Sequence, residues 1–509
     1  MKIQRRKFLK QTAGLGIVST LSLLTNAAYA DYFNQIGLGG RDLNTGLRIL
    51  NYGFGGRLED KDPKQIPSEV KTLYSKMYNL LAKNRRMTHV ELFSDAEVKS
   101  MCKSRNIKHI GGPMLGNVTS TGIKVWVRTL YPAAVKIRVE TIDGTVDFGP
   151  VHSTAESDYA AVVPVKGLKP NTRYPYSLII DDKAVSLPFE PSFKTVNDEK
   201  ASSKRIAFGT CPHRSGLGNS KLFELIRRRE PSAMLLGGDI AVQDRRKNGA
   251  KHRADYILRD LQPPWKRFSA NIPVYAAWDD HDYFDNDLAG IPNGFSDNDR
   301  RNICSIFRNS WNNPSYGASN GVFFRTRIEP CDVIMLDHRY FRNQDDSNKF
   351  LGDAQMQWLK KQLAGCKGPF VILSCGTMWS DYVSNGKDSW GTTAPSEREE
   401  LFSFIEKNKI PGVILISGDR HGARGFLIPR PSGYNFYEFE VAALGGRSGP
   451  PAATEKWETQ LFGFAKKYMF AEFDFNTKRA DPEVTFKLFQ DSGKKLYTKT
   501  LKQSQLTPK

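Results

Sequence analysis

The pattern of apolar and polar residues changes along the chain. Between about residues 109 and 195 the two kinds alternate, as in Ile123-Lys124-Val125 and Val135-Lys136-Ile137. A period of two predicts strands that bury one face. Short strands of this kind, separated by turns such as Asp143-Gly144, predict an all-β sandwich over residues 108–197, which we interpret as a packing module.

From residue 203 onward the apolar runs become continuous, which predicts strands covered on both faces. These runs are Ile206–Phe208, Ala233–Leu236, Pro273–Ala277, Val333–Leu336, Phe370–Leu373 and Val413–Ile416. Helical patterns lie between them, one with Met356 and Leu359 on one face and another that begins at a capping box of Ser396 and Glu399. We therefore predict an α/β layered catalytic domain over residues 203–500, preceded by an immunoglobulin/fibronectin-like β-sandwich.

The preceding segment, residues 31–107, shows one amphipathic pattern. A helix is predicted to start near Pro67-Ser68, with Val70, Leu73 and Met77 on one face. No residue pattern in this N-terminal extension indicates chemistry, so we interpret it as a packing arm.

The first thirty residues have the pattern of an export signal. A charged start with Arg5-Arg6 is followed by the short apolar stretch Ala13–Leu24 and by Ala28-Tyr29-Ala30, a small-x-small cleavage pattern. The segment resembles a twin-arginine signal, although an uncleaved anchor and an ordinary secretory signal are alternatives. The expectation is a periplasmic or secreted protein that engages the twin-arginine export machinery and keeps no stable membrane span after cleavage.

Composition narrows the class of protein. The 509 residues are 39% hydrophobic and 25% charged, which is typical of a folded chain of two or three domains. A net charge of +20 favours an anionic substrate, but the basic residues are scattered and predict no dedicated nucleic-acid module. Six cysteines are too few for a disulfide scaffold, while one or two bridges stay open.

Polar and acidic residues follow the apolar runs. Cys211 follows the first run, Asp239 the second, Trp278–Asp282 the third, Asp337-His338-Arg339 the fourth and Asp419-Arg420-His421 the last. Each alone is more often a cap, a packed histidine or a core cysteine. Ligands bind at the carboxyl edge of open α/β sheets, and acidic residues crowded at the edge of one predicted sheet repel each other unless cations lie between them. The order of these residues therefore predicts a two-metal site that makes a hydroxide nucleophile for a phosphate ester.

These stretches resemble the PhoD-type alkaline phosphatases (alkaline phosphatase D) of the calcineurin-like metallophosphoesterase superfamily. The matching segments are Gly209–Pro212, Gly238-Asp239, Trp278–Tyr283, Leu336–Arg342, Gly352–Gln355 and Ser417–His421. The resemblance also covers the signal and the β-sandwich, but not the N-terminal extension.

The resemblance implies roles for particular residues. Cys211 and His421 would bind the first metal ion, Asp239 would bridge both ions, and Asp280 and Asp419 would hold the second. The same resemblance implies ferric iron (Fe3+) at the first position and calcium (Ca2+) at the second. By analogy, His281 would protonate the leaving group, while Arg339 and Arg420 are candidate substrate-binding residues.

Two positions depart from the resembled pattern. Val242 stands where the family has a tyrosine ligand to iron, so iron is replaced or water fills the position. Arg424 stands where related sequences often have an acidic residue, and either contacts the substrate or faces solvent.

The resulting hypothesis is an exported phosphoesterase that acts on an anionic phosphate-ester substrate at a binuclear site. A phosphodiesterase or phospholipase-type variant of the same chemistry is one alternative. A non-catalytic binding protein on this fold, suggested by Val242, is another. A serine hydrolase is disfavoured because no Gly-x-Ser-x-Gly motif follows a strand.

Overall fold

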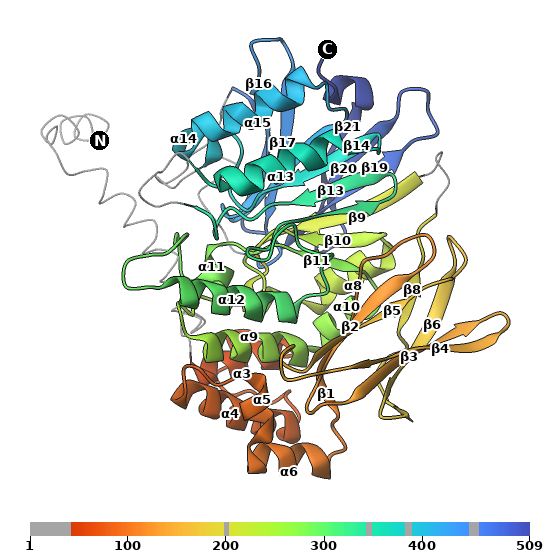
Figure 1. Cartoon of the computed structure of the whole chain (residues 1–509), viewed down its shortest axis with the longest axis vertical. Coiled ribbons are helices and arrows are strands. Elements are labelled where there is room, and N and C mark those ends of the chain that lie inside the picture. The colour runs from red at the N-terminus through yellow and green to blue at the C-terminus, as the bar shows by residue number, and fades with distance from the viewer. Residues whose placement is uncertain (1–41, 198–202, 343–348, 382–388, 447–457) are drawn as a thin grey trace, which may run out of the picture.

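A computed structural model of the chain describes residues 42–197, 203–342, 349–381, 389–446 and 458–509 (Figure 1). The predicted export signal, residues 1–30, lies outside the described residues. Among the helices that are described, none combines the length and the apolar character needed to cross a membrane.

Two large sheets form the centre of the C-terminal part of the chain. The first has six strands in the order β11-β10-β9-β19-β20-β21, and the second has seven in the order β12-β13-β14-β15-β17-β16-β18. The first sheet comprises β9 (Ser203–Gly209), β10 (Ala233–Leu236), β11 (Val274–Ala276), β19 (Met469–Asn476), β20 (Glu483–Gln490) and β21 (Lys495–Lys502). The second comprises β12 (Phe324–Ile328), β13 (Cys331–Met335), β14 (Phe370–Ser374), β15 (Val413–Ser417), β16 (Gly422–Pro429), β17 (Asn435–Ala442) and β18 (Gln460–Phe464).

The six apolar runs found in the sequence are all strands, but they do not share one sheet as predicted. β9, β10 and β11 pair in parallel in the first sheet, whereas β13, β14 and β15 pair in parallel in the second. The reason is that β9 pairs on its other side with β19, an antiparallel strand more than 250 residues later in the chain. Local periodicity carries no information about such a distant partner.

The two sheets pack face to face, and helices cover their outer faces. Ile206 and Phe208 of β9 face a core shared with Ile372 and Ile416 of the second sheet, while Ala207 faces the helices. Helices α8 (Ser220–Arg228), α9 (Gly249–Leu261), α10 (Pro263–Ser269) and α12 (Asp297–Ser310) pack on the first sheet, as Figure 1 shows. Helices α13 (Gly352–Ala364) and α15 (Pro395–Lys407) pack on the second sheet. The predicted layered α/β fold class is confirmed.

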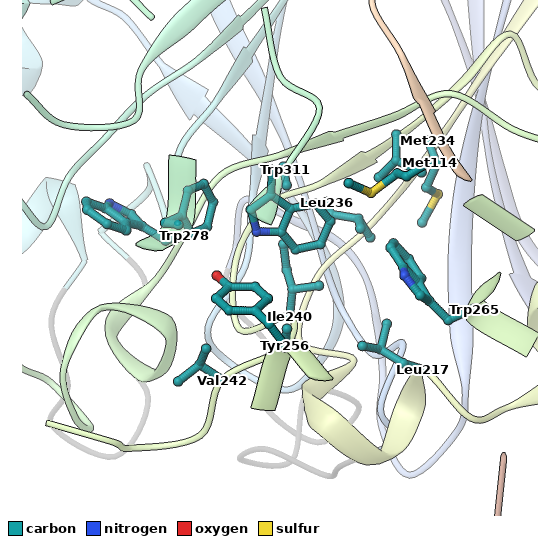
Figure 2. Packing of buried hydrophobic residues seen from close by; sticks show 14 of the residues in the cluster. Met114, Leu217, Met234, Leu236, Ile240, Val242, Tyr256, Trp265, Trp278 and Trp311 are labelled. Carbon is teal, nitrogen blue, oxygen red and sulfur yellow. The ribbon is translucent and has the colours of Figure 1, made fainter. Parts of the chain in front are cut away.

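Figure 2 shows the core between the first sheet and its helices. Met234 and Leu236 of β10 pack with Trp265 of α10 and with Trp311. Burying such large apolar side chains contributes about 1.5–3 kcal/mol each relative to exposure. This core is therefore a rigid support for the loops that leave the carboxyl ends of the strands.

The predicted capping box of Ser396 and Glu399 does not form. Helix α15 begins at Pro395, so its N-cap is Ala394 and not Ser396. Ala394 makes no side-chain hydrogen bond. Proline is favoured at the first helical position because its fixed φ suits the helix and its missing N–H is not needed there.

Two smaller sheets precede the two large sheets along the chain, in the part for which the sequence predicts a sandwich. One sheet has the order β1-β2-β5 and the other β4-β3-β6-β7, with β8 paired to β6. Val125 and Val163 of the first sheet and Val135 and Ile137 of the second meet in one core. The strands are β1 (His109–Gly116), β2 (Ile123–Thr129), β3 (Ala134–Thr141), β4 (Gly144–His152), β5 (Ala160–Val165), β6 (Arg173–Ile180), β7 (Lys183–Ala184) and β8 (Ser192–Lys194).

Between residue 42 and these sheets lie four helices, of which the sequence predicted one. The predicted helix is α4 (Ser68–Lys83), which buries Leu73 and Met77. The others are α3 (Leu43–Gly53), α5 (His89–Ser94) and α6 (Ala96–Ser104). They share a core with Ala254 and Ile257 of α9. The N-terminal extension therefore packs directly on the helices that cover the first large sheet.

No disulfide forms. All six cysteines lie in the described residues and each is unpaired. The protein therefore relies on its cores for stability, and Cys211 is available as a thiolate ligand.

Candidate metal centre

The loops that leave β9, β10, β11 and β15 bring a set of ligand side chains together. Cys211, Asp239, Asp419 and His421 all have left-handed backbone conformations, with φ of +53°, +53°, +76° and +44°. Such conformations are unfavourable for residues other than glycine and cluster at functional sites. Cys211, Asp239 and Asp419 are buried and His421 is half-buried, and these backbone conformations orient the four side chains in ways that regular strands would not.

One group of candidate ligands contains Cys211, His213, Asp239 and His421. Each offers a ligand atom within 4.8 Å of the others. Cys211 Sγ lies 3.4 Å from Asp239 Oδ2, and His213 Nε2 lies 3.1 Å from His421 Nε2. Burial and the charge of Asp239 raise the pKa of the Cys211 thiol well above its ordinary value, so a cation would have to displace its proton. A cysteine sulfur, two imidazoles and a carboxylate converge here, which is a donor set for a transition metal.

His213 was missed in the sequence. It begins the short helix α7 (His213–Gly216) and is almost fully buried. The signal was the spacing Cys211-Pro212-His213, because two metal donors separated by one residue can reach the same ion. The resemblance drew attention to the cysteine alone.

A second group contains four carboxylates, from Asp239, Asp279, Asp280 and Asp419. Asp239 Oδ1 and Asp279 Oδ2 are buried and have no hydrogen-bond partner within the described part of the chain. Burial raises the pKa of Asp239 well above its ordinary value, and the charges of Asp280 and Asp279 add to this shift. Uncompensated buried carboxylates are costly, and cations offset that cost.

Asp279 was not among the predicted ligands. Its Oδ1 accepts from Arg339 Nε at 2.5 Å and lies 2.9 Å from His338 Nε2. Burial acts to raise the pKa of Asp279, but Arg339 and His338 outweigh it and hold that pKa well below its usual range. Asp279 is therefore ionised, and Arg339 Nη2 also lies 3.9 Å from Asp280 Oδ1.

Asp280 and His281 begin the short helix α11 (Asp280–Tyr283). Asp280 Oδ2 accepts from the backbone N–H of Asp287 at 2.6 Å, which fixes the carboxylate. His281 Nδ1 donates to Asp244 Oδ1 and lies 3.1 Å from Gln243 Nε2. Burial acts to lower the pKa of His281, but Asp244, Asp239 and Asp280 raise it well above its ordinary value.

The loop that carries Asp239 is held by Asp282. This buried carboxylate accepts hydrogen bonds from the backbone N–H groups of residues 240, 241 and 242 at 3.0–3.2 Å. The Val242 side chain packs into the hydrophobic core near Tyr256, as Figure 2 shows, and no ligand group includes residue 242. The position of the expected tyrosine ligand is therefore a core position in this chain.

The two candidate substrate-binding arginines lie beside ligand carboxylates and are nearly fully buried. Arg339 contacts Asp279, and Arg420 Nη2 lies 3.2 Å from Asp419 Oδ2.

Arg424 does not face solvent, contrary to one of its two sequence interpretations. It is fully buried, and its Nη1 donates to Glu440 Oε2 at 2.7 Å. The strand register explains the pairing, because Arg424 of β16 stands opposite Glu440 of β17. A buried arginine needs such a carboxylate partner.

The predicted ligands Cys211, Asp239, Asp280, Asp419 and His421 all belong to these two groups of converging atoms. His281 belongs to a third group, which it forms with Asp239 and Asp280. The structure adds His213 and Asp279, and Asp239 is common to all three groups.

Comparisons with known proteins concern the family and the fold of the chain. Residues 227–493 match the family model described as PhoD-like phosphatase, and residues 108–197 match a domain of unknown function, DUF7800. No match to a curated protein was found. A solved structure titled "Structure of PhoD" superposes with a TM-score of 0.63 at 17% identity, covering 77% of this chain and 92% of that one. A second, "GAP50 the anchor in the inner membrane complex of Plasmodium", gives a TM-score of 0.38 at 14% identity and covers 59% and 89%.

Proposed function

The chain belongs to the family of PhoD-like phosphatases and is a metal-dependent phosphoric ester hydrolase, and from this premise we propose that it works with two cations bridged by Asp239. The observation that supports a pair is the sharing of Asp239 between the thiolate–imidazole group and the four-carboxylate group. His213, Cys211 and His421 would hold the first cation. The carboxylates of Asp279, Asp280 and Asp419 would hold the second.

The donor sets favour different cations at the two positions. The second position offers only carboxylate oxygens, which suit a hard cation such as calcium. The first offers sulfur and nitrogen, which suit a transition metal. When bound, such a pair makes a water molecule nucleophilic near neutral pH and draws negative charge from the phosphoryl oxygens.

His281 is proposed to protonate the leaving oxygen. A carboxylate only accepts hydrogen bonds, so the contact with Asp244 places one proton on His281 Nδ1. The opposite nitrogen, Nε2, then carries the proton that is transferred to the departing alkoxide. Asp244 raises the pKa of His281 more than the other carboxylates do and is not a proposed cation ligand, so its charge favours a protonated ring beside the cations as well.

Arg339 and Arg420 are proposed to bind the anionic phosphoryl group. Each already lies beside a carboxylate of the second cation position, so a phosphate brought to the cations also comes close to their positive charge. Planar guanidinium groups match the geometry of phosphate oxygens.

The proposal includes export through the twin-arginine machinery to the periplasm or the cell exterior. The pattern of residues 1–30 supports this part of it. That route carries folded proteins, which is compatible with cations loaded before export.

The test compares metal content and hydrolysis in the same preparations. The wild type, purified without chelators, should contain two cations and release nitrophenol from 4-nitrophenyl phosphate or from its bis ester. Asp239→Ala should lose both cations and about 10³-fold in rate, equivalent to about 4 kcal/mol. Asp353→Ala, at an exposed aspartate on α13, should keep both. Full activity in Asp239→Ala, or metal-free wild type, contradicts the proposal, and the two substrates separate monoesterase from diesterase activity.

A further inference from the structure

We infer that the first cation position selects a divalent cation of borderline softness, zinc above all, rather than ferric iron, and that His213 supplies the ligand that makes the difference. This inference rests on the proposed function, since it concerns the same pair of positions. It follows from the side chains at the site and departs from the iron implied by the sequence resemblance.

The first step is that no phenolate is supplied from the expected position. Val242 is fully buried in the hydrophobic core. Asp282 holds the loop there by accepting from the backbone N–H groups of residues 240, 241 and 242. Tyr283, the tyrosine adjoining the ligand segment, donates its hydroxyl to the carbonyl of Gly290 at 2.6 Å. A hard phenolate oxygen would favour a trivalent cation. Residue 242 supplies none, and the hydroxyl of Tyr283 is hydrogen-bonded to Gly290 instead.

The second step is that an imidazole is present instead. The ring of His213 lies between those of His281 and His421, at centroid distances of 5.4 and 5.2 Å. Its Nε2 is 3.1 Å from His421 Nε2. Two imidazole nitrogens on a tetrahedral zinc are about 3.3 Å apart, because each Zn–N distance is about 2.0–2.1 Å. The two rings thus approach each other as ligands of one zinc ion do.

The third step concerns softness and charge. Cys211 sulfur, two imidazole nitrogens and one carboxylate form a set typical of zinc. With neutral imidazoles, the thiolate and the Asp239 carboxylate bring at most two negative charges, and Asp239 is shared with the second position. A divalent cation is balanced by these donors, whereas a trivalent cation in so buried a site keeps uncompensated charge.

The first experiment measures which metal the full chain takes. Protein purified without chelators from cells supplied with both iron and zinc is analysed by mass spectrometry. About one zinc ion per chain and only traces of iron are expected. Iron at a level near one per chain overturns the inference.

The second experiment uses cobalt(II) as a spectroscopic probe of the metal-free full chain. A thiolate ligand gives cobalt an intense near-ultraviolet charge-transfer band. The band should appear in the wild type and in Cys366→Ser, a cysteine outside the ligand groups, and vanish in Cys211→Ser. A wild-type spectrum without this band contradicts the inference whether or not any variant folds.

The third experiment tests His213 itself by zinc titration, after circular dichroism shows that the variants are folded. His213→Gln should weaken zinc affinity at the first position at least about tenfold, or about 1.4 kcal/mol. His152→Gln, at an exposed histidine of β4, should leave the affinity unchanged. Equal affinities in the wild type and His213→Gln rule out the ligand role.

Different results would contradict the zinc inference and the proposed function. Iron-loaded protein that hydrolyses phosphate esters would contradict the zinc inference and support the proposed function. Zinc-loaded protein that does not hydrolyse phosphate esters would contradict the proposed function and support the zinc inference.

Discussion

Single carboxylates near the site have different partners and therefore different roles. Asp239 has a buried oxygen without a hydrogen-bond partner in the described residues, as the proposed role of a cation ligand requires. Asp282 is saturated by backbone N–H donors and supports a loop instead. Asp244 accepts from the side chains of Gln243 and His281, and it fixes the proton of His281. Residue type alone does not separate these roles, because the partners decide them.

The acid role of His281 predicts a dependence on the leaving group. His281→Ala removes the proton donor but leaves Cys211, His213 and the ligand carboxylates in place, so both cations should stay bound. The rate should fall about 10²–10⁴-fold for an alkyl phosphate, whose leaving oxygen needs the proton. The loss should be much smaller for 4-nitrophenyl phosphate, whose leaving group is a weaker base.

Steady-state rates on both substrates, together with metal content, check this prediction. Gln243→Ala removes the other neighbour of His281 Nδ1 and should have a smaller effect, because Asp244 still holds the ring. An equal loss on good and poor leaving groups in His281→Ala argues against proton donation.

At the level of elements, the loop after β10 depends on the short helix α11. Asp282 of α11 accepts three backbone N–H groups of the loop, and Asp239 lies directly before them. Burial raises the pKa of Asp282 to about 6, while the three N–H groups oppose that shift. A side chain from another element therefore positions the loop that carries Asp239, the proposed bridging ligand.

Replacing Asp282 should loosen both the loop and the metal site. The three N–H groups converge on Asp282 Oδ1, and Oδ2 also accepts from Ile240 at 3.0 Å. Asp282→Asn removes the negative charge that strengthens these bonds and, with its oxygen kept at Oδ1, turns Oδ2 into a donor that faces the Ile240 N–H, at a cost of about 1–3 kcal/mol. The free energy of unfolding should fall by that amount, and the cations should dissociate faster.

Urea unfolding and competition with a chelator measure the two effects. Asp95→Asn is a matched control, because Asp95 also accepts two backbone N–H groups, as the N-cap of the surface helix α6. Asparagine caps helices as well as aspartate does, so only a few tenths of a kcal/mol are expected. A similar small change in Asp282→Asn contradicts the supporting role.

At the scale of the whole molecule, one buried contact joins three parts of the chain. Asp158, from the turn before β5, accepts from His89 Nδ1 at 3.1 Å and from Arg253 Nε at 2.7 Å. His89 belongs to α5 of the N-terminal extension and Arg253 to α9 of the catalytic layers. Arg128 of β2 donates to His89 Nε2 at 3.5 Å. With both ring nitrogens so engaged, His89 is neutral.

This contact predicts a dependence of stability on pH. Burial and the charge of Arg128 lower the pKa of His89 to about 3, whereas the unfolded chain protonates this ring near pH 6.5. The contribution of His89 to the free energy of unfolding is therefore complete above pH 6.5 and is lost as the pH falls toward 3. In that range the free energy of unfolding falls by up to about 1.4 kcal/mol per pH unit because of this residue.

Urea unfolding between pH 7.5 and pH 4 checks the prediction. His89→Gln should be less stable at pH 7.5 and should show a slope reduced by about one proton. His152→Gln, at an exposed histidine, should keep the wild-type slope. An unchanged slope in His89→Gln would show that the ring is not held neutral.

The amino-acid sequence was enough to predict six strands of the two large sheets and most of the residues that converge at the candidate site. The apolar runs are the strands β9, β10, β11, β13, β14 and β15, with bounds that differ by at most three residues, because continuous hydrophobicity over a few residues is a local property. Covalent spacing fixed which polar residues follow each strand, so Asp239, Asp280 and His421 were found as ligand candidates. The α3, α5 and α6 helices were missed, since they are short and their burial depends on α9.

Only the tertiary structure decided which residues meet. The strands separated into two facing sheets, His213 and Asp279 joined the ligand groups, and Val242 entered the core while Arg424 paired with Glu440. Each outcome depends on partners far away in the chain, such as β19 beside β9. Periodicity and spacing report a residue's own neighbourhood, whereas a ligand set is defined by distances across several loops, which exist only after the sheets have packed.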